Sequence, residues 1–187
     1  AASIGVRQAD GGSQFTAELG QILDMEIFID ATGEEVTGYS FFISYNSSVF
    51  NLVPAEFDDS GLPLPFATTS YLGGITLANA VEESEGETLL SYTEASGGVS
   101  RNSATGRGVV ARFRLEVAKR SISETTAIRV ERRGHGRVSH YVRFDAPGIE
   151  QHFSEPLGVA IVRVTGFRIA PSLPDLIVIE GETQQVF

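Results

Sequence analysis

The side chains that could perform chemistry in this chain are few and scattered. Its three histidines, His135, His140 and His152, fall within eighteen residues of one another. Imidazole nitrogens are common metal ligands, but such a spacing favours a metal on a helix, and a Gly-rich turn followed by a strand does not supply that geometry. We therefore interpret them as exposed histidines of loops and strand edges, with a shared histidine site as the less favoured alternative.

Clustered carboxylates are the second candidate for chemistry. Asp58 and Asp59, together with the glutamates between residues 82 and 87, could supply the several oxygen ligands that Ca²⁺ prefers. The alternative, which we favour, is a pair of solvated acidic loops. The sequence thus predicts no metal bound by the chain itself.

Groupings typical of enzymes are missing from the sequence. The chain has no cysteine, which excludes disulfides, thiolate nucleophiles and cysteine-ligated metals. It contains no G-x-S-x-G elbow, no phosphate-binding Gly-rich loop, no H-E-x-x-H and no EF-hand spacing. We therefore expect no catalytic residue and no resident cofactor, and we predict that the protein is not an enzyme.

A sugar-binding role is also weakly supported. Carbohydrate-binding grooves use flat aromatic side chains, and the chain has no Trp. The alternation of the strands predicts that Tyr39, Tyr45 and Tyr92 point inward, which leaves Tyr71 and Tyr141 as weak platform candidates. A carbohydrate-binding module is kept as an alternative function.

Composition and charge narrow the function classes further. At 187 residues, 42% hydrophobic and 20% charged, the chain is of ordinary globular composition and about one domain long. No apolar run approaches the roughly 20 residues that span a bilayer, so no membrane insertion is expected. The net charge of −10 argues against a nucleic-acid partner.

Basic residues are concentrated late in the chain. Thirteen of the fourteen follow residue 100, and nine lie between Arg112 and Arg143 against three acids. We expect them to form a basic stripe on an acidic body, which suits the steering of an acidic protein partner.

The elements that must position these groups are strands. Few segments keep apolar residues at helical spacing, whereas alternation with a period of two recurs along the chain. It is clearest at 23–29, 38–45, 89–93 and 109–117, and 127–131, 138–144 and 158–164 complete a set of some seven to nine strands. Polar and Gly-rich turns separate them, and residues 56–71 read as a long loop. The pattern predicts an all-β sandwich.

The same alternation predicts which side chains face outward. Phe42 is expected to project from an otherwise polar strand face, where an exposed ring would anchor a partner. Arg112 and Arg114 are expected outward on another strand, where guanidinium groups can bind carboxylates in a planar, bidentate manner. The alternative is that a loop covers Phe42 and that both arginines are only solvated.

The succession of these strands resembles cohesin modules. Residues 20–30 and 38–52 are similar to the opening strands of that family, with its Gly, alternating aromatic residues and Tyr-Asn pair. Residues 106–117 resemble its G-x-G-h-h-A strand and residues 158–164 its closing strand, so the resemblance covers residues 18–165. It implies a jelly-roll β-sandwich of about nine strands, residues 1–17 being an N-terminal extension. Residues 166–187 are expected to be a linker and the first strand of a following module, unless this tail docks back on the domain.

The resemblance also implies a function. A cohesin is a non-catalytic module that captures a dockerin, anchoring enzymes on a scaffold or cell surface, and the calcium of that complex belongs to the dockerin. We therefore expect a monomeric, extracellular or cell-surface module within a longer chain. Carried onto this sequence, the expected partner-binding residues lie on three strands that we expect in one sheet. They are Ser40, Phe42 and Ser44, then Leu89, Ser91 and Thr93, then Val110, Arg112 and Arg114.

Two departures from the best-known cohesins concern the partner. Ser40 stands where an acidic contact is common, and a Pro-containing segment follows Val53. A cohesin-like fold with another partner, and a structural spacer or adhesin module of a surface protein, are therefore kept as alternatives.

Overall fold

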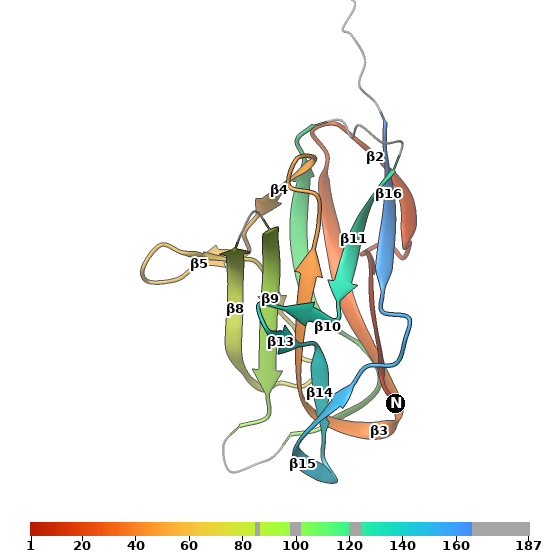
Figure 1. Ribbon diagram of the computed structural model, residues 1–187, viewed down its shortest axis with the longest axis vertical. Helices are drawn as coiled ribbons and strands as arrows, with labels where there is room; N and C mark the ends of the chain where they lie inside the picture. The colour runs from red at the N-terminus through yellow and green to blue at the C-terminus, as the bar shows by residue number, and fades with distance from the viewer. Residues whose placement is uncertain (85–86, 98–101, 120–124, 166–187) are drawn as a thin grey trace, which may run out of the picture.

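The computed structural model describes residues 1–84, 87–97, 102–119 and 125–165 (Figure 1). These residues form strands and turns arranged as two packed layers, the jelly-roll β-sandwich that the sequence predicted. The described part of the chain contains no helix long and apolar enough to cross a membrane.

One long strand, β3 (Ile22–Ser44), belongs to both layers. Its first half pairs with β1 (Ser3–Gln8) and β10 (Ala104–Val117), and its second half pairs with β9 (Glu87–Ala95). Between the halves Gly33 has a φ of 86°, a left-handed conformation that glycine adopts without the clash a Cβ would cause. This bend carries the chain from one layer into the other.

The remaining strands complete the layers as follows. Layer A comprises β1, the first half of β3, β10, β4 (Phe50–Val53) and β7 (Ala67–Thr68). Layer B comprises the second half of β3 with β8 (Ile75–Ser84), β9, β11 (Thr125–Glu131), β14 (His140–Arg143), β15 (Ala146–His152), β16 (Val159–Thr165) and β2 (Gln14–Glu18). Two small hairpins pair outside this hydrogen-bonded network, β5 (Glu56–Phe57) with β6 (Pro63–Leu64), and β12 (Arg133–Gly134) with β13 (Arg137–Val138).

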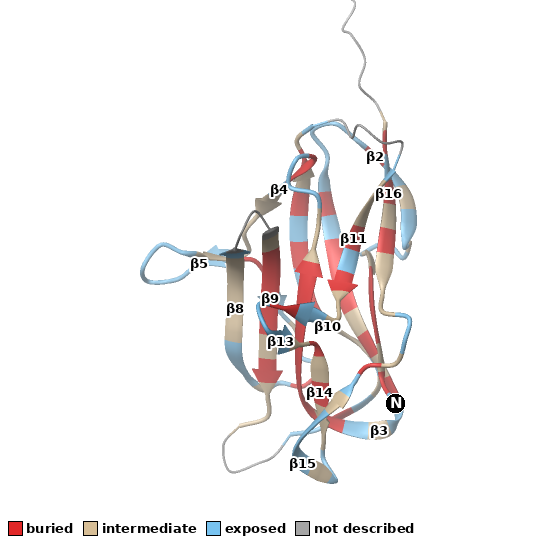
Figure 2. Ribbon diagram, in the orientation of Figure 1, coloured by how far each residue is buried: buried red, intermediate tan, exposed pale blue. Residues whose placement is uncertain are grey.

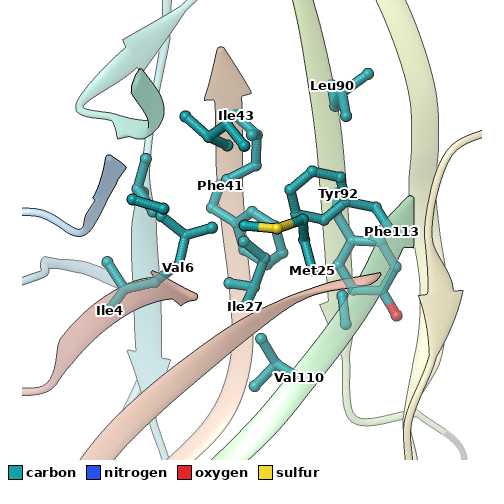
Figure 3. Packing of buried hydrophobic residues seen from close by; sticks show 14 of the residues in the cluster. Ile4, Val6, Met25, Ile27, Phe41, Ile43, Leu90, Tyr92, Val110 and Phe113 are labelled. Atoms are coloured by element: carbon teal, nitrogen blue, oxygen red, sulfur yellow. The ribbon is translucent and has the colours of Figure 1, made fainter. Parts of the chain in front are cut away.

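The core lies between the layers. Met25 and Ile27 of layer A pack in one buried cluster with Phe41, Ile43 and other side chains of layer B (Figures 2 and 3). The predicted inward faces of residues 23–29 and 39–45 are confirmed, because one face of each strand is apolar and burial of apolar area stabilises by about 25 cal/mol per Å².

The predicted N-terminal extension is corrected by the pairing of the first strands. Ile4 and Val6 of β1 lie in the core, and β2 pairs in parallel with β16 at the edge of layer B. Residues 1–17 are therefore part of the sandwich, because the short alternation at 4–6 buries two apolar side chains. The predicted linker and following strand at 166–187 lie outside the described residues.

A buried carboxylate stands at the end of β9. Glu94 is almost fully buried and its Oε1 accepts hydrogen bonds from the hydroxyls of Tyr39, at 2.7 Å, and Tyr92, at 3.1 Å. Its Oε2 accepts from the backbone N–H of Gly74 at 2.8 Å. This charge-assisted network joins β3, β9 and the turn before β8, which fixes one end of layer B.

Candidate partner-binding face

Part of the outer face of layer B carries small side chains. Strand register places Ser40 beside Thr93, Phe42 beside Ser91, and Ala80 of β8 beside Ser91 on its other side. Ser40 Oγ and Thr93 Oγ1 are 2.8 Å apart, within hydrogen-bonding distance. The part of the face that carries these short side chains therefore lies close to the backbone plane of the sheet.

A hairpin that the sequence reading missed crosses this face. We call residues 132–139 the flap; it contains β12 and β13, the latter labelled in Figure 1 near β9. Its turn residues His135 and Gly136 have φ values of 49° and 82°, as a type I′ turn requires. Each of the two strands of the flap is two residues long.

The flap packs directly on Phe42. A Cβ on Gly134 would lie 2.6 Å from the Phe42 ring and 3.0 Å from Leu89 Cδ1, so only glycine allows this approach. The guanidinium carbon of Arg137 lies 5.0 Å from the centroid of the same ring, in cation–π range. The backbone N–H of Phe42 donates to Ser139 Oγ at 3.3 Å.

Glu82 of β8 holds the flap through an ion pair with Arg137. Its Oε1 lies 2.5 Å from Arg137 Nη2 and 3.9 Å from His135 Nε2, and its Oε2 accepts from Ser91 Oγ at 2.8 Å. Burial raises the pKa of Glu82, but the hydrogen bonds from Arg137 and Ser91 and the nearby positive charge outweigh it, so the pKa lies below its usual value. The ionised carboxylate therefore stabilises the flap in its position on layer B.

The prediction that Phe42 is an exposed anchor is wrong. Phe42 is 0% exposed and Leu89 is 2% exposed, because the flap covers both. Ser40 and Ser91 are also buried, whereas Ser44 and Thr93 are partly exposed. The alternative that a chain segment covers Phe42 is what the structure shows.

The three predicted residues of β10 lie elsewhere. β10 pairs with the first half of β3 in layer A, so Arg112 and Arg114 are on the opposite side of the sandwich from Ser40 and Thr93. Val110 is the extra residue of a β-bulge between Val109 and Ala111, and it is fully buried in the core (Figure 3). The expectation of one sheet containing all nine residues is wrong, because alternation separates inside from outside but does not assign a strand to a layer.

The arginines of the predicted basic stripe are divided between the two layers. Arg112 forms an ion pair with Glu26 in layer A at 3.3 Å, and Arg143 in layer B forms one with Asp145 at 2.5 Å. Other arginines do lie on the candidate face: Arg129 of β11 is exposed beside Ser44, and Arg133 is exposed on the flap. The alternation of residues 127–131 could have predicted that Arg129 points outward. The position of Arg133 could not be predicted in this way, because it depends on the tight turn of the flap at residues 135–136.

The other sequence candidates are accounted for by local contacts. His140 and His152 are register partners on β14 and β15, and His135 lies on the flap. Within the described ranges, no three His, Asp or Glu side chains are grouped to hold a metal. Asp58 Oδ1 accepts from the backbone N–H groups of Ser60 and Leu62, both at 2.8 Å, in its own turn.

The two tyrosines proposed as sugar platforms differ in exposure, and the hydroxyl of each is bound within the sandwich. Tyr141 is 1% exposed, and its hydroxyl donates to Glu34 Oε1 at 2.8 Å. Tyr71 is half-buried, and its hydroxyl donates to the carbonyl of Gly106 at 2.9 Å. The inward orientation predicted for Tyr39 and Tyr92 is confirmed.

Comparison with known proteins identifies the fold. Neither a protein-family model nor a curated protein sequence matches the chain. Solved structures do match: the seventh ScaB type I cohesin of Pseudobacteroides cellulosolvens, 12% identical, has a TM-score of 0.59, and the match covers 90% of this chain and 94% of that one. A type I cohesin of Clostridium thermocellum, solved in complex with a dockerin, has a TM-score of 0.59 at 12% identity over 87% and 99%. A non-cellulosomal cohesin of the archaeon Archaeoglobus fulgidus has a TM-score of 0.54 at 10% identity over 96% and 99%. The chain has the cohesin fold, as its resemblance predicted.

Proposed function

We propose that this chain is a non-catalytic, cohesin-like binding module that captures a dockerin or dockerin-like partner, as part of a larger secreted or cell-surface protein. The observation that carries the proposal is the match of the fold over most of the chain to cohesins, of which several were solved as complexes with dockerins. Any calcium in the complex is expected on the partner.

The outer face of layer B is the surface we propose for the partner. Ser44 and Thr93 are partly exposed there, on either side of the position that the flap covers, and Ser40 and Ser91 are buried beside them. Phe42 and Leu89 act from below by supporting the flap, and Val110, Arg112 and Arg114 have no part in this contact. Beside the flap the side chains of this face are small, so a partner can approach the strands closely there.

The chemistry around this face favours a partner with apolar and acidic groups. Ile75 and Leu77 of β8 are 54% and 65% exposed at one margin, which gives the face an apolar rim. Arg129 and Arg133 are exposed at the opposite end, where guanidinium groups can pair with carboxylates. Such an arrangement orients the partner as well as holding it.

A calorimetric titration tests the proposal. The chain should bind at least one member of a panel of dockerins in the presence of Ca²⁺, and EDTA should abolish binding by unfolding the dockerin rather than this chain. Circular dichroism of the chain should be unchanged by EDTA. A panel that includes dockerins of both cellulosomal and non-cellulosomal type and shows no binding would overturn the proposal.

A further inference from the structure

A hollow lies on the opposite side of the sandwich from the candidate face, where β10 is incompletely paired. β4 ends its pairing with β10 at Arg114, beside Val53, and β7 resumes it at Arg112, beside Ala67. Between these points the chain makes a detour, and the opening is a cavity of about 270 Å³. This volume is below the roughly 300–1,000 Å³ of pockets that hold drug-sized ligands, so it suits a single side chain.

The hollow has an apolar interior and a charged mouth. Val53 and Ala67 line its sides, and its lining also includes Met25 and Phe113, two residues whose side chains pack in the core (Figure 3). Arg112, Arg114 and Asp24 are exposed lining residues. The bulge at Val110 brings Arg107 onto the same outer face as Arg112 and Arg114, because their register partners Asp30, Glu26 and Asp24 all alternate outward.

The two arginines at the mouth differ in their pairing. Arg112 is held by Glu26, which also forms an ion pair with Arg7 at 3.0 Å. Arg114 is exposed and forms no ion pair with any carboxylate of the described residues, although Asp24 is its register partner. A guanidinium beside an apolar hollow can bind a carboxylate whose carrier also fills the hollow.

We infer that this hollow binds the C-terminal residue of a peptide that ends in an apolar side chain. Such a residue carries three groups on one Cα. Its apolar side chain fits the apolar interior, its carboxylate can bind Arg114, and its amide N–H can donate to Asp24. Neighbouring side chains of an extended internal segment point to opposite sides, so an internal acid next to an apolar residue does not present both groups together. Capture of a terminal carboxylate is a known mode of peptide recognition.

An adjoining depression favours a peptide over a free amino acid. A polar hollow of about 480 Å³ lies on the other side of Arg112 and includes Thr69, Ser70 and Arg107. It offers hydroxyl and guanidinium groups to the residues that precede the terminal one. This site lies on the face opposite to the proposed dockerin contact, so either can fail without the other.

An NMR titration of the whole chain tests this site. The probe is an N-acetylated tripeptide, Ala-Ala-Leu, with a free α-carboxylate, compared with the same peptide as a C-terminal amide and with free leucine. The free acid should shift the amide signals of Val53 and Ala67 saturably, and the amide should bind about tenfold more weakly or worse, the loss of one charge-assisted hydrogen bond. Arg114→Gln should weaken the acid by a similar factor.

Matched variants test whether peptide binding depends on this hollow rather than on a general change in charge or folding. Ala67→Phe should block the hollow, and because Ala67 is exposed the chain should still fold. Arg133→Gln, on the flap, should leave the affinity unchanged. The inference would be overturned if the free-acid peptide bound no more tightly than its amide or than free leucine. It would also be overturned if Arg114→Gln or Ala67→Phe bound the free-acid peptide with full affinity.

Discussion

Glu94 shows how much a single buried side chain contributes to layer B. Its carboxylate accepts three hydrogen bonds, from two tyrosine hydroxyls and the backbone of Gly74. Burial, and then the hydrogen bond to Glu94, raise the pKa of Tyr39 far above its ordinary value, so this phenol remains a donor. Alanine at position 94 would remove this acceptor from the hydroxyls of the buried Tyr39 and Tyr92 and from the partly buried N–H of Gly74.

We therefore expect Glu94→Ala to lower the free energy of unfolding by roughly 2–4 kcal/mol. The exposed Glu83 offers a matched control, and Glu83→Ala should change stability by less than about 0.5 kcal/mol. Urea unfolding followed by circular dichroism measures both. Equal stabilities of the two variants would show that the network contributes nothing.

Gly134 is the residue that lets the flap close. A methyl group there meets the Phe42 ring at 2.6 Å, so Gly134→Ala should destabilise the chain by about 1–3 kcal/mol through overpacking. Gly12→Ala is the control, because a Cβ at Gly12 has no neighbour nearer than 3.5 Å. Thermal unfolding should separate the two variants, and a Gly134→Ala protein as stable as the wild type would contradict the packing described for the flap.

At the scale of elements, the flap is held by charge and is therefore sensitive to acid. The pKa of Glu82 is lowered in the folded state, so its contribution is present above the unfolded value of about 4.3 and is lost as the pH falls through the lower folded value. The stability difference between wild type and Glu82→Gln should shrink as the pH falls from about 5 to 3. Urea unfolding of both proteins over this range measures it, and a difference that does not change with pH would contradict the ion pair with Arg137.

Comparison of the strands with the alternation of the sequence shows which features of the fold could be predicted. The alternation of β3, β9 and β10 predicted their inward faces, apart from Val109 and Val110 at the bulge, because period two follows from strand geometry. It could not reveal that β3 serves both layers, since both halves alternate in the same way. The flap was missed because strands of two residues carry no periodicity, and Phe42 was misread because its cover comes from residues nearly a hundred positions later.

At the scale of the molecule, the sandwich presents two faces of different character. The outer face of layer B carries the flap, Arg129 and Arg133, whereas layer A carries Arg112 and Arg114 above an alternating row of acids. If the first face takes an acidic partner, the association rate should fall as salt is added. Arg129→Gln should reduce both the rate and its salt dependence, while Arg114→Gln should alter neither. A rate independent of salt in stopped-flow measurements would remove the case for steering.

Paired variants on the two faces give the sharpest test of whether the partner binds the outer face of layer B. Thr93→Arg places a long charged side chain in the middle of that face, and Arg114→Glu reverses a charge on the opposite one. For a dockerin that binds the wild type, calorimetry should show about 100-fold weaker binding by Thr93→Arg and an unchanged affinity for Arg114→Glu, with both variants folded by circular dichroism. Retained affinity in Thr93→Arg together with a loss in Arg114→Glu would place the contact on layer A and contradict the account.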